Sequence, residues 1–589
     1  MKNRIYTEYK HILTFILLLS FLIAGPGCGG GEKITYTDVS IEHDYLGGDY
    51  EIFFPDTSTD VNLTYTLNLG LDPKDVFFIF TNTSESNYAL PQLLENTVSG
   101  RSADEDEPAL LTVPESADQT VPVLQRGKPQ ISDFNRNALL NTDSLSRNIY
   151  EPLEDPMPSN DTLGGTGTFY LGLSSSGSSV SASCRYVSGL IAGKTLNIWV
   201  ANDCLSPSGT KSRLVTDAMV AELAKVFLKD GVDDIYTWVT DIFGDEWGTP
   251  PFTNLIDDNN EITILLYDID NDNTTPLTEG GVAGYFYAKD NFKSSYYSGS
   301  NQRIMFYLDA VMFANGDGTD GTDWDVSDPS PGDIVSTLAH EFQHMIHFYQ
   351  KQIKYELTTG TETWLDEMCS LVAEDFITMK LGALSGAEQV IIKGPRGVDG
   401  DTTGPGLPFN YDGRLPAYNY YNYISLTDWP DDDASNEFFL MSYAMSYAFG
   451  AYLARNYGGA EFFRNIVQCA YTDYRAVEYA AGVMGHDDNF TTILRNWGVA
   501  NLLSDKTTVP QYEYNSGTDG FIADSLGYVL GSINLRNYYP TPFIWPYLPS
   551  SSSMYPVSNF LYIAGDNIQG ANTWTLQMRK PVRLTVLVR

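Results

Sequence analysis

Residues 330–347 read Ser330-Pro-Gly-Asp-Ile-Val-Ser-Thr-Leu-Ala-His340-Glu341-Phe-Gln-His344-Met-Ile-His347, and this stretch decides the architecture around it. Pro331 suits the first position of a helix, and Ser330 followed three residues later by Asp333 resembles a capping box. Apolar residues recur along the stretch at helical spacing: Ile334, Leu338, Phe342 and Met345. The pattern predicts a helix of roughly five turns with one buried face.

Two histidines of this helix are spaced to bind one metal ion. Residues four apart share a helix face, so His340 and His344 project together, about 6 Å apart along the axis. That position suits two nitrogens on one zinc ion, while Glu341 is offset by about 100° and reaches the edge of the site without being a ligand. We predict His340 and His344 as zinc ligands and Glu341 as the general base. His347 is expected to pack beside the site.

A catalytic zinc also needs a third protein ligand and one open position. The residues after His344 supply no second Gly-x-x-His pair, but an acidic, helix-like segment follows at residues 361–375. Within it, Glu367 follows His344 after 22 intervening residues, in the sequence Trp364-Leu-Asp-Glu367. Glu362 and Glu374 in the same segment remain alternatives to Glu367.

The Trp364-Leu-Asp-Glu367 sequence resembles the Trp-Leu-Asn-Glu of zinc aminopeptidases and, more closely, the hyicolysin family of secreted bacterial neutral metallopeptidases. The resemblance extends over about residues 205–505. Its specific pieces are Ile235-Tyr-Thr-Trp-Val-Thr-Asp-Ile-Phe-Gly-Asp-Glu-Trp247, Gly284-Tyr-Phe-Tyr287 and Ala339-His-Glu-Phe-Gln-His344. It implies an α+β fold with a thermolysin-like gluzincin domain, in which a small twisted sheet covers the active-site helix and a helical lobe follows.

The same resemblance implies roles for further residues. It makes Glu367 the third zinc ligand and Tyr447 the hydrogen-bond donor to the oxyanion, with Tyr443 and His486 as alternatives to Tyr447. The substrate-amine signature of aminopeptidases is not visible, so the resemblance favours an endopeptidase.

The amino-acid composition limits the classes of partner that the protein can bind. The formal net charge is −40, from 35 basic and 75 acidic residues, and a surface this acidic repels phosphate backbones, which argues against nucleic-acid binding. An aromatic content of 13% excludes disorder as the main state. We expect a protein or peptide substrate.

The N-terminus reads as an export signal. Three basic residues precede an apolar run at 12–24, and Cys28 follows within a glycine-rich tether. This resembles a bacterial lipoprotein signal, although Gly25 stands where leucine is usual. We predict a signal peptide at 1–28, with Cys28 as a lipid anchor in the outer membrane or on the cell surface, and plain secretion as the alternative. The anchor would be the sole membrane contact. Export permits a disulfide, for which Cys184 and Cys204 are the expected pair.

The remaining chain suggests flanking β-structure. Alternating side chains predict a β-rich N-terminal domain at 29–204, containing a polar, proline-rich loop, linker or propeptide-like stretch near 100–165. The catalytic domain is expected at 205–505 and a small β-rich module at 506–589.

An acidic loop has the spacing of a calcium site. Asp268, Asp270, Asp272 and Glu279 occupy positions 1, 3, 5 and 12 of a loop, which predicts Ca²⁺ binding, with a solvated acidic loop as the alternative.

These features together predict a zinc-dependent endopeptidase acting on extracellular or envelope proteins, with Glu341 activating the water. The alternative is a surface-anchored binding protein or adhesin on a peptidase scaffold. Retention of Glu341 argues against that alternative, because a degenerate scaffold has no need of the base. A third reading is a metal-dependent hydrolase of non-peptide amides.

Overall fold

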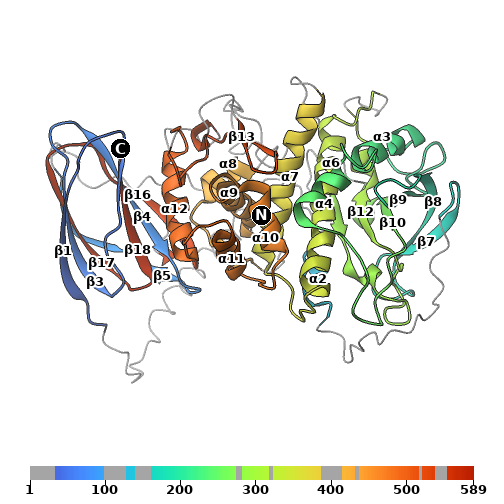
Figure 1. Ribbon diagram of the computed structural model, residues 1–589, viewed down its shortest axis with the longest axis horizontal. Coiled ribbons are helices and arrows are strands. Elements are labelled where there is room, and N and C mark those ends of the chain that lie inside the picture. The colour runs from blue at the N-terminus through green and yellow to red at the C-terminus, as the bar shows by residue number, and fades with distance from the viewer. Residues whose placement is uncertain are drawn as a thin grey trace, which may run out of the picture.

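The computed structural model describes residues 34–98, 128–139, 161–273, 281–316, 323–385, 414–430, 437–507, 509–515, 521–537 and 553–589. The predicted signal peptide with Cys28 lies outside these residues, as do Glu279 and most of the predicted linker. Figure 1 shows a β-sandwich at one end, a helical lobe in the middle and a six-stranded sheet at the other end. This arrangement of separate sheets and helices is consistent with the α+β class.

A mixed sheet supports the candidate site. Its strands follow the order β11-β12-β10-β9-β8-β7, with β9, β10 and β12 parallel and the outer strands antiparallel. The central strand β10 is buried along its whole length, which fits its largely apolar sequence Ile262-Thr-Ile-Leu-Leu-Tyr267. The bounds are β7 (Thr166–Tyr170), β8 (Ser179–Val187), β9 (Thr195–Ala201), β10 (Glu261–Tyr267), β11 (Gly284–Phe286) and β12 (Met305–Asp309).

Helices cover this sheet and place the His-Glu-x-x-His segment beside its edge strand. The long helix α6 packs against β11 and β12, and it continues into a π-helical turn at Phe348–Ile353. The other helices of this region are α2 (Pro129–Asn137), α3 (Asp217–Phe227), α4 (Ile235–Phe243) and α5 (Ala310–Phe313), while α6 itself spans Pro329–His347. Short 3-10 turns lie at Ile269–Asn271 and Ala288–Asn291.

The sheet corrects one predicted domain boundary. Residues 166–201 were expected in an N-terminal β-rich domain ending at residue 204, but β9 pairs in parallel with β10 over six residues and β8 pairs with β9. The expected start of the catalytic domain at residue 205 is therefore wrong, because it would cut through the middle of one sheet.

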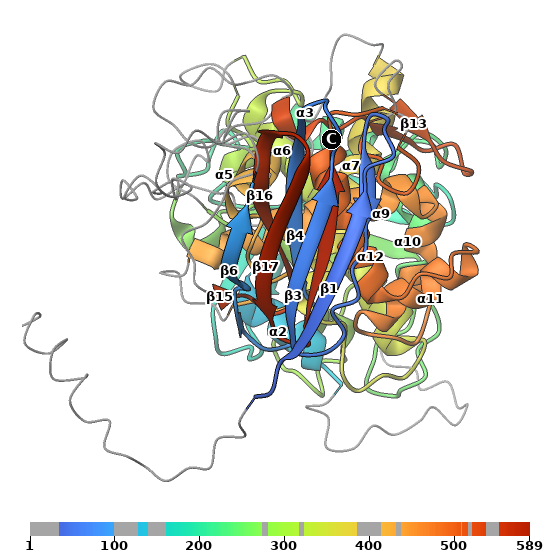
Figure 2. The ribbon, with the colours of Figure 1, turned by 90° about the vertical axis from the view of Figure 1, so that its left-hand side faces the viewer.

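A β-sandwich combines the two ends of the chain. One sheet has the order β1-β3-β17-β6 and the other β16-β4-β18-β2 (Figure 2). Every second side chain of β3 is buried, as expected for a strand with one face in a core. The bounds are β1 (Thr37–Asp44), β2 (Glu51–Phe53), β3 (Val61–Asn68), β4 (Lys74–Asn82), β6 (Gln92–Thr97), β16 (Ser558–Ile568), β17 (Ala571–Met578) and β18 (Val582–Val588).

The sandwich corrects the predicted separation of N-terminal and C-terminal β-modules. Strand β3 pairs with β17 over eight residues, and β4 lies between β16 and β18. Without the strands from the other end of the chain, either set would expose its apolar face and leave strand edges unpaired. The two ends therefore form one module.

The helical lobe joins the sandwich to the mixed sheet. Helix α12 packs against β4 and β16, and α7 packs against both α6 and α9. The bounds are α7 (Thr363–Ser385), α8 (Arg414–Tyr421), α9 (Glu437–Asn456), α10 (Gly459–Val467), α11 (Arg475–Val483) and α12 (Phe490–Leu503). Four minor strands complete the described strands, namely β5 (Tyr88–Ala89), β13 (Phe521–Ala523), β14 (Val529–Gly531) and β15 (Ser553–Met554).

The cysteines of the described residues form no disulfide. Cys184, Cys204, Cys369 and Cys469 are all buried and free, so the expected Cys184–Cys204 disulfide is absent; the Cys184 Sγ faces the carbonyl of Tyr186 and the Cys204 Sγ faces Asp203. Across the described residues, no helix has the length and apolar character to span a bilayer.

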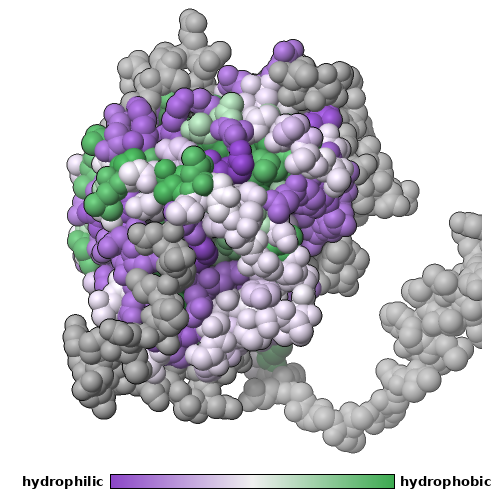
Figure 3. Space-filling view, turned by 90° about the vertical axis from the view of Figure 1, so that its right-hand side faces the viewer, coloured by the Kyte–Doolittle hydropathy of each residue, from purple (hydrophilic) through white to green (hydrophobic). Residues whose placement is uncertain are grey.

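The surface at the end of the molecule that holds the mixed sheet has both hydrophilic and hydrophobic residues, with a band of hydrophobic residues across its upper part (Figure 3).

Candidate active site

Helix α6 presents the candidate site. It is 19 residues long, which confirms the predicted five turns, but it begins at Pro329 with Asp328 as the N-cap. The hydroxyl of Ser330 donates to the carbonyl of Met312, so the expected capping box does not form. His340 and Glu341 are 0% and 1% exposed, so both functional groups lie inside the protein.

Three atoms from α6 and α7 converge on one point. The Nε2 atoms of His340 and His344 lie 3.1 Å apart, and the Glu367 Oε2 lies 3.2 Å from the first and 3.6 Å from the second. A tetrahedral zinc with bonds of 2.0–2.1 Å holds its ligand atoms about 3.3 Å apart. The three atoms therefore have the mutual spacing of three corners of a zinc site.

The state of the Glu367 carboxylate supports the same fit. Its side chain is 2% exposed, and its Oε2 has no hydrogen-bond partner among the described residues. Burial opposes its ionisation, but the imidazoles of His344 and His340 outweigh burial and lower the pKa of Glu367. An ionised, buried oxygen facing two imidazole nitrogens fits a divalent cation.

Two more carboxylates hold the histidines from behind. The Nδ1 of His340 donates to Oε1 of Glu374 at 2.8 Å, and the Nδ1 of His344 donates to Oδ1 of Asp366 at 3.0 Å. Such partners fix the tautomer so that Nε2 faces the metal. Glu374 lies two turns beyond Glu367 on α7. Its carboxylate therefore reaches the Nδ1 side of His340 and not the point where the two Nε2 atoms and the Glu367 Oε2 converge.

The other alternative ligand lies elsewhere. The Oε2 of Glu362 accepts a hydrogen bond from Nε1 of Trp364 at 2.7 Å. Glu362 is thus held at the start of α7 by its neighbour. Of the three candidates in this segment, the structure brings Glu367 to the two imidazole Nε2 atoms.

Glu341 is held with one oxygen fixed and one available. Its Oε2 accepts the backbone N–H of Phe286 at 2.8 Å, while its Oε1 has no hydrogen-bond partner among the described residues. One ligand atom each of Glu341, His340 and His344 lie within 4.8 Å of one another. Burial raises the pKa of Glu341, which makes it a stronger proton acceptor once ionised.

A pocket opens beside these groups. It encloses a cavity of about 30 Å³, and Glu341, His344 and Phe286 are in its wall. That volume holds a water molecule or two. His347 also lines this pocket and packs beside the cluster as expected, with its Nε2 2.8 Å from the Thr361 hydroxyl and its Nδ1 3.1 Å from Asp366.

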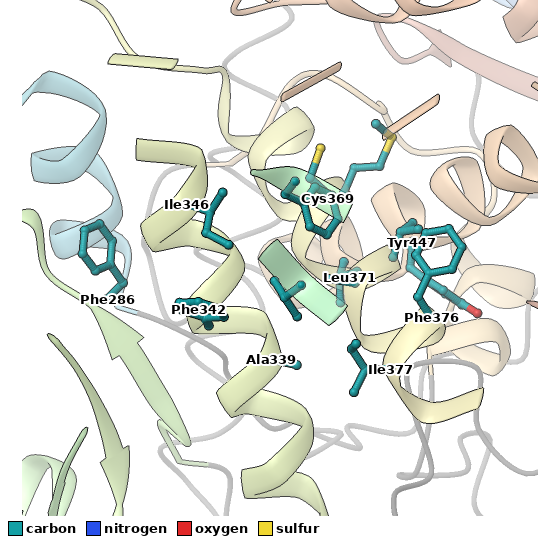
Figure 4. Close-up of a cluster of buried hydrophobic side chains, with 14 of the residues drawn as sticks. Phe286, Ala339, Phe342, Ile346, Cys369, Leu371, Phe376, Ile377 and Tyr447 are labelled. Atoms are coloured by element: carbon teal, nitrogen blue, oxygen red, sulfur yellow. The ribbon is translucent and has the colours of Figure 1, made fainter. Parts of the chain in front are cut away.

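Tyr447 is not brought to the cluster, which corrects its expected role as oxyanion donor. Helix α7 lies between α6 and Tyr447 (Figure 4). The Tyr447 hydroxyl donates to Asp375 at 3.1 Å, and Asp375 also pairs with Arg455. Gly450 lets α9 approach α7 closely, since a Cβ there would lie 2.6 Å from Val372, and this packing turns Tyr447 toward the far face of α7.

The two alternatives to Tyr447 are also engaged elsewhere. The ring of Tyr443 contacts Trp429 with centroids 5.0 Å apart, and the ring of His486 lies 4.7 Å from that of Tyr457.

The acidic loop is paired with lysines. Lys211 forms an ion pair with Asp268 at 2.5 Å, and Lys128 forms one with Asp270. Glu279 lies outside the described residues. Calcium binding at this loop stays a prediction.

Sequence reasoning missed the contribution of α2. Ile131, Ser132, Asn135 and Arg136 line the same pocket as Glu341, although their segment reads as linker. The signal was the helical spacing of Ile131, Phe134 and Ala138 after a proline at the first turn. Lys351 and Gln352, from the π-helical turn after α6, were missed as well.

Two comparisons place this site among known proteins. The family model of Peptidase M30 matches residues 180–389, a range that begins in β8 and contains the three converging residues. The neutral metalloprotease ShpI of Staphylococcus hyicus is 26% identical over 295 residues, which is 49% of this chain and 52% of that protein. The chain thus spans about half the length of this relative. Together these matches show that residues 180–389 are similar to the Peptidase M30 family and that the chain resembles a neutral metalloprotease.

Proposed function

We propose that this protein is a zinc-dependent endopeptidase that cleaves proteins outside the cytoplasm. The observation that carries the proposal is the convergence of His340 Nε2, His344 Nε2 and Glu367 Oε2 at mutual distances of 3.1 to 3.6 Å. These three residues would hold the zinc ion, and Glu341 would be the general base. Packing of α6 against the sheet on one side and α7 on the other supports a thermolysin-like arrangement.

The chemistry follows from the groups around the cluster. When bound, zinc would polarise the substrate carbonyl and lower the pKa of a water molecule. Glu341 takes the proton of the attacking water on Oε1, while the Phe286 N–H holds Oε2 in place. The same carboxyl then passes the proton to the leaving amine. Glu374 and Asp366 keep His340 and His344 oriented through their Nδ1 atoms.

The substrate class rests on the site and on the relatives. A general base beside a three-ligand site suits hydrolysis of an amide, and the relative ShpI is a neutral metalloprotease. The basic, apolar and cysteine-containing N-terminus supports export, with Cys28 as the proposed lipid anchor. The target would accordingly be a protein of the envelope or the surroundings.

Metal analysis and a protein-hydrolysis assay test the proposal. We expect about one zinc per purified chain, lost in His344→Ala, since a structural or catalytic zinc requires its full ligand set. Casein hydrolysis should stop on adding a chelator and return with zinc. Casein that stays intact with the zinc-loaded protein, while a non-peptide amide is cleaved, would reject the endopeptidase.

A further inference from the structure

Helix α2 crosses the pocket at the candidate site. It lies beside Phe286 and the C-terminal part of α6 (Figures 1 and 4). Side chains of α2 line the pocket together with Glu341 and His344. Whatever enters the pocket from this side must therefore share the space with α2.

Asn135 of α2 occupies the backbone groups at the edge of the sheet. Its Nδ2 donates to the carbonyl of Phe286 and its Oδ1 accepts from the N–H of Ala288, both at 2.8 Å. Strand β11 ends at Phe286 and is the outer strand of the sheet, with β12 as its neighbour on the other side. A carbonyl and the N–H two residues later point to the same side of an extended chain, and an added peptide strand would use them. The Asn135 amide thus takes the place of a peptide group.

The opposite wall holds the backbone of α2. The carbonyl of Asn135 accepts from Nε2 of Gln352, and the carbonyl of Arg136 accepts from the N–H of Gly360, each at 2.8 Å. A Cβ on Gly360 would lie 2.8 Å from that same carbonyl, so the approach is close. Helix α2 therefore bridges the pocket from the sheet edge to the segment that follows α6.

Apolar contacts also hold helix α2 in place. The ring of Phe134 meets Tyr287 and Tyr297 edge to face, with centroids 5.2 and 5.5 Å apart. Ala138 and Leu139, which follow α2, are 0% and 1% exposed. The pocket that α2 helps to line has a volume of about 30 Å³, which is space for a water molecule or two.

We propose that residues 128–139 form an internal inhibitory segment, in which Asn135 occupies the backbone groups that an extended protein substrate would pair with. This inference rests on the proposed function and adds its regulation. The segment is internal because strands β3 and β4, which precede it, are built into the sandwich with the C-terminal strands. Displacement of α2, and not loss of the N-terminal region, would open the site.

Substitutions in α2 test the proposal in the full-length chain. Asn135→Ala removes both contacts with the sheet edge, and Phe134→Ala removes the aromatic contacts. The matched control is Asn137→Ala on the same helix, because among the described residues the Asn137 side chain donates hydrogen bonds only to Asp133. Loss of two hydrogen bonds should raise the rate of casein hydrolysis about tenfold in Asn135→Ala, and the control should match the wild type.

A binding measurement separates this proposal from the proposed function. In the Glu341→Gln background, fluorescently labelled casein should bind about tenfold more tightly when Asn135→Ala is added, by the same lost contacts. If Asn135→Ala tightens casein binding but no variant that keeps Glu341 hydrolyses casein, the peptidase is rejected and the inhibitory segment is retained. Hydrolysis and binding that are unchanged in Asn135→Ala and Phe134→Ala would overturn the inhibitory segment. A reduced rate with a higher KM in Asn135→Ala would also overturn it, since α2 would then be a wall that holds substrate.

Discussion

Replacement of Glu374 by glutamine tests whether the carboxylate behind His340 contributes to metal binding. Glu374 is 0% exposed, its Oε1 accepts the Nδ1–H of His340 at 2.8 Å, and its Oε2 accepts the hydroxyl of Ser336. Glu374→Gln preserves the size of the side chain and one acceptor oxygen. It removes the negative charge that favours the Nδ1–H tautomer.

The expected loss can be worked out from this one hydrogen bond. A hydrogen bond to a charged group contributes about 1.5–3 kcal/mol, whereas a neutral one contributes about 1 kcal/mol. The difference of roughly 0.5–2 kcal/mol corresponds to a zinc affinity that is about 2- to 30-fold weaker, which overlaps the range of about 10- to 100-fold expected when the outer partner of a metal-bound histidine is changed.

Competition with a chromophoric chelator would measure the apparent Kd for zinc in the wild type and the variant. The matched control is Glu362→Gln, which makes the same chemical change at a carboxylate bonded to Trp364, away from the cluster. Circular dichroism would verify that both variants keep the fold. Equal zinc affinity in Glu374→Gln and the wild type would refute an orienting role for Glu374.

Three further predictions follow from the same contacts. Glu341→Gln should bind zinc normally and lose about 10²- to 10⁴-fold in kcat on casein, the usual contribution of a general base; normal turnover would remove Glu341 from the mechanism. Tyr447→Phe should lower the free energy of unfolding by about 1–2 kcal/mol through the lost bond to Asp375, and should leave kcat unchanged; a loss of kcat with unchanged stability would restore Tyr447 as an oxyanion donor. Burial raises the pKa of Asp309 to about 8, with a contribution from Asp268, so between pH 4 and 8 the unfolded chain releases a proton that the folded chain keeps. Stability should fall as pH rises through that window, and urea unfolding at pH 5 and pH 8 should show a smaller fall in Asp309→Asn than in the wild type.

Local patterns in the chain determined the helix α6 and the direction of its functional groups. Helical periodicity involves residues three and four apart, so the shared face of His340 and His344 needs no knowledge of the rest of the fold. The same holds for β10, whose largely apolar sequence predicts a strand from neighbouring residues alone. The motif around Glu367 was also visible, although Glu362 and Glu374 lay within the same segment.

The tertiary structure decided which of those local elements meet. Strand β3 pairs with β17 across some 500 residues of chain, and strand periodicity specifies a buried face without specifying its partner. The rotation of α9 that turns Tyr447 toward Asp375 is set by its packing on α7 at Gly450. Helix α2 reads as a short, weak helix within a linker, and its place over the pocket depends on backbone groups of Phe286, Ala288 and Gly360. Contacts between distant segments determine these arrangements, because hydrophobic burial and backbone pairing do not specify a partner until the whole fold has formed.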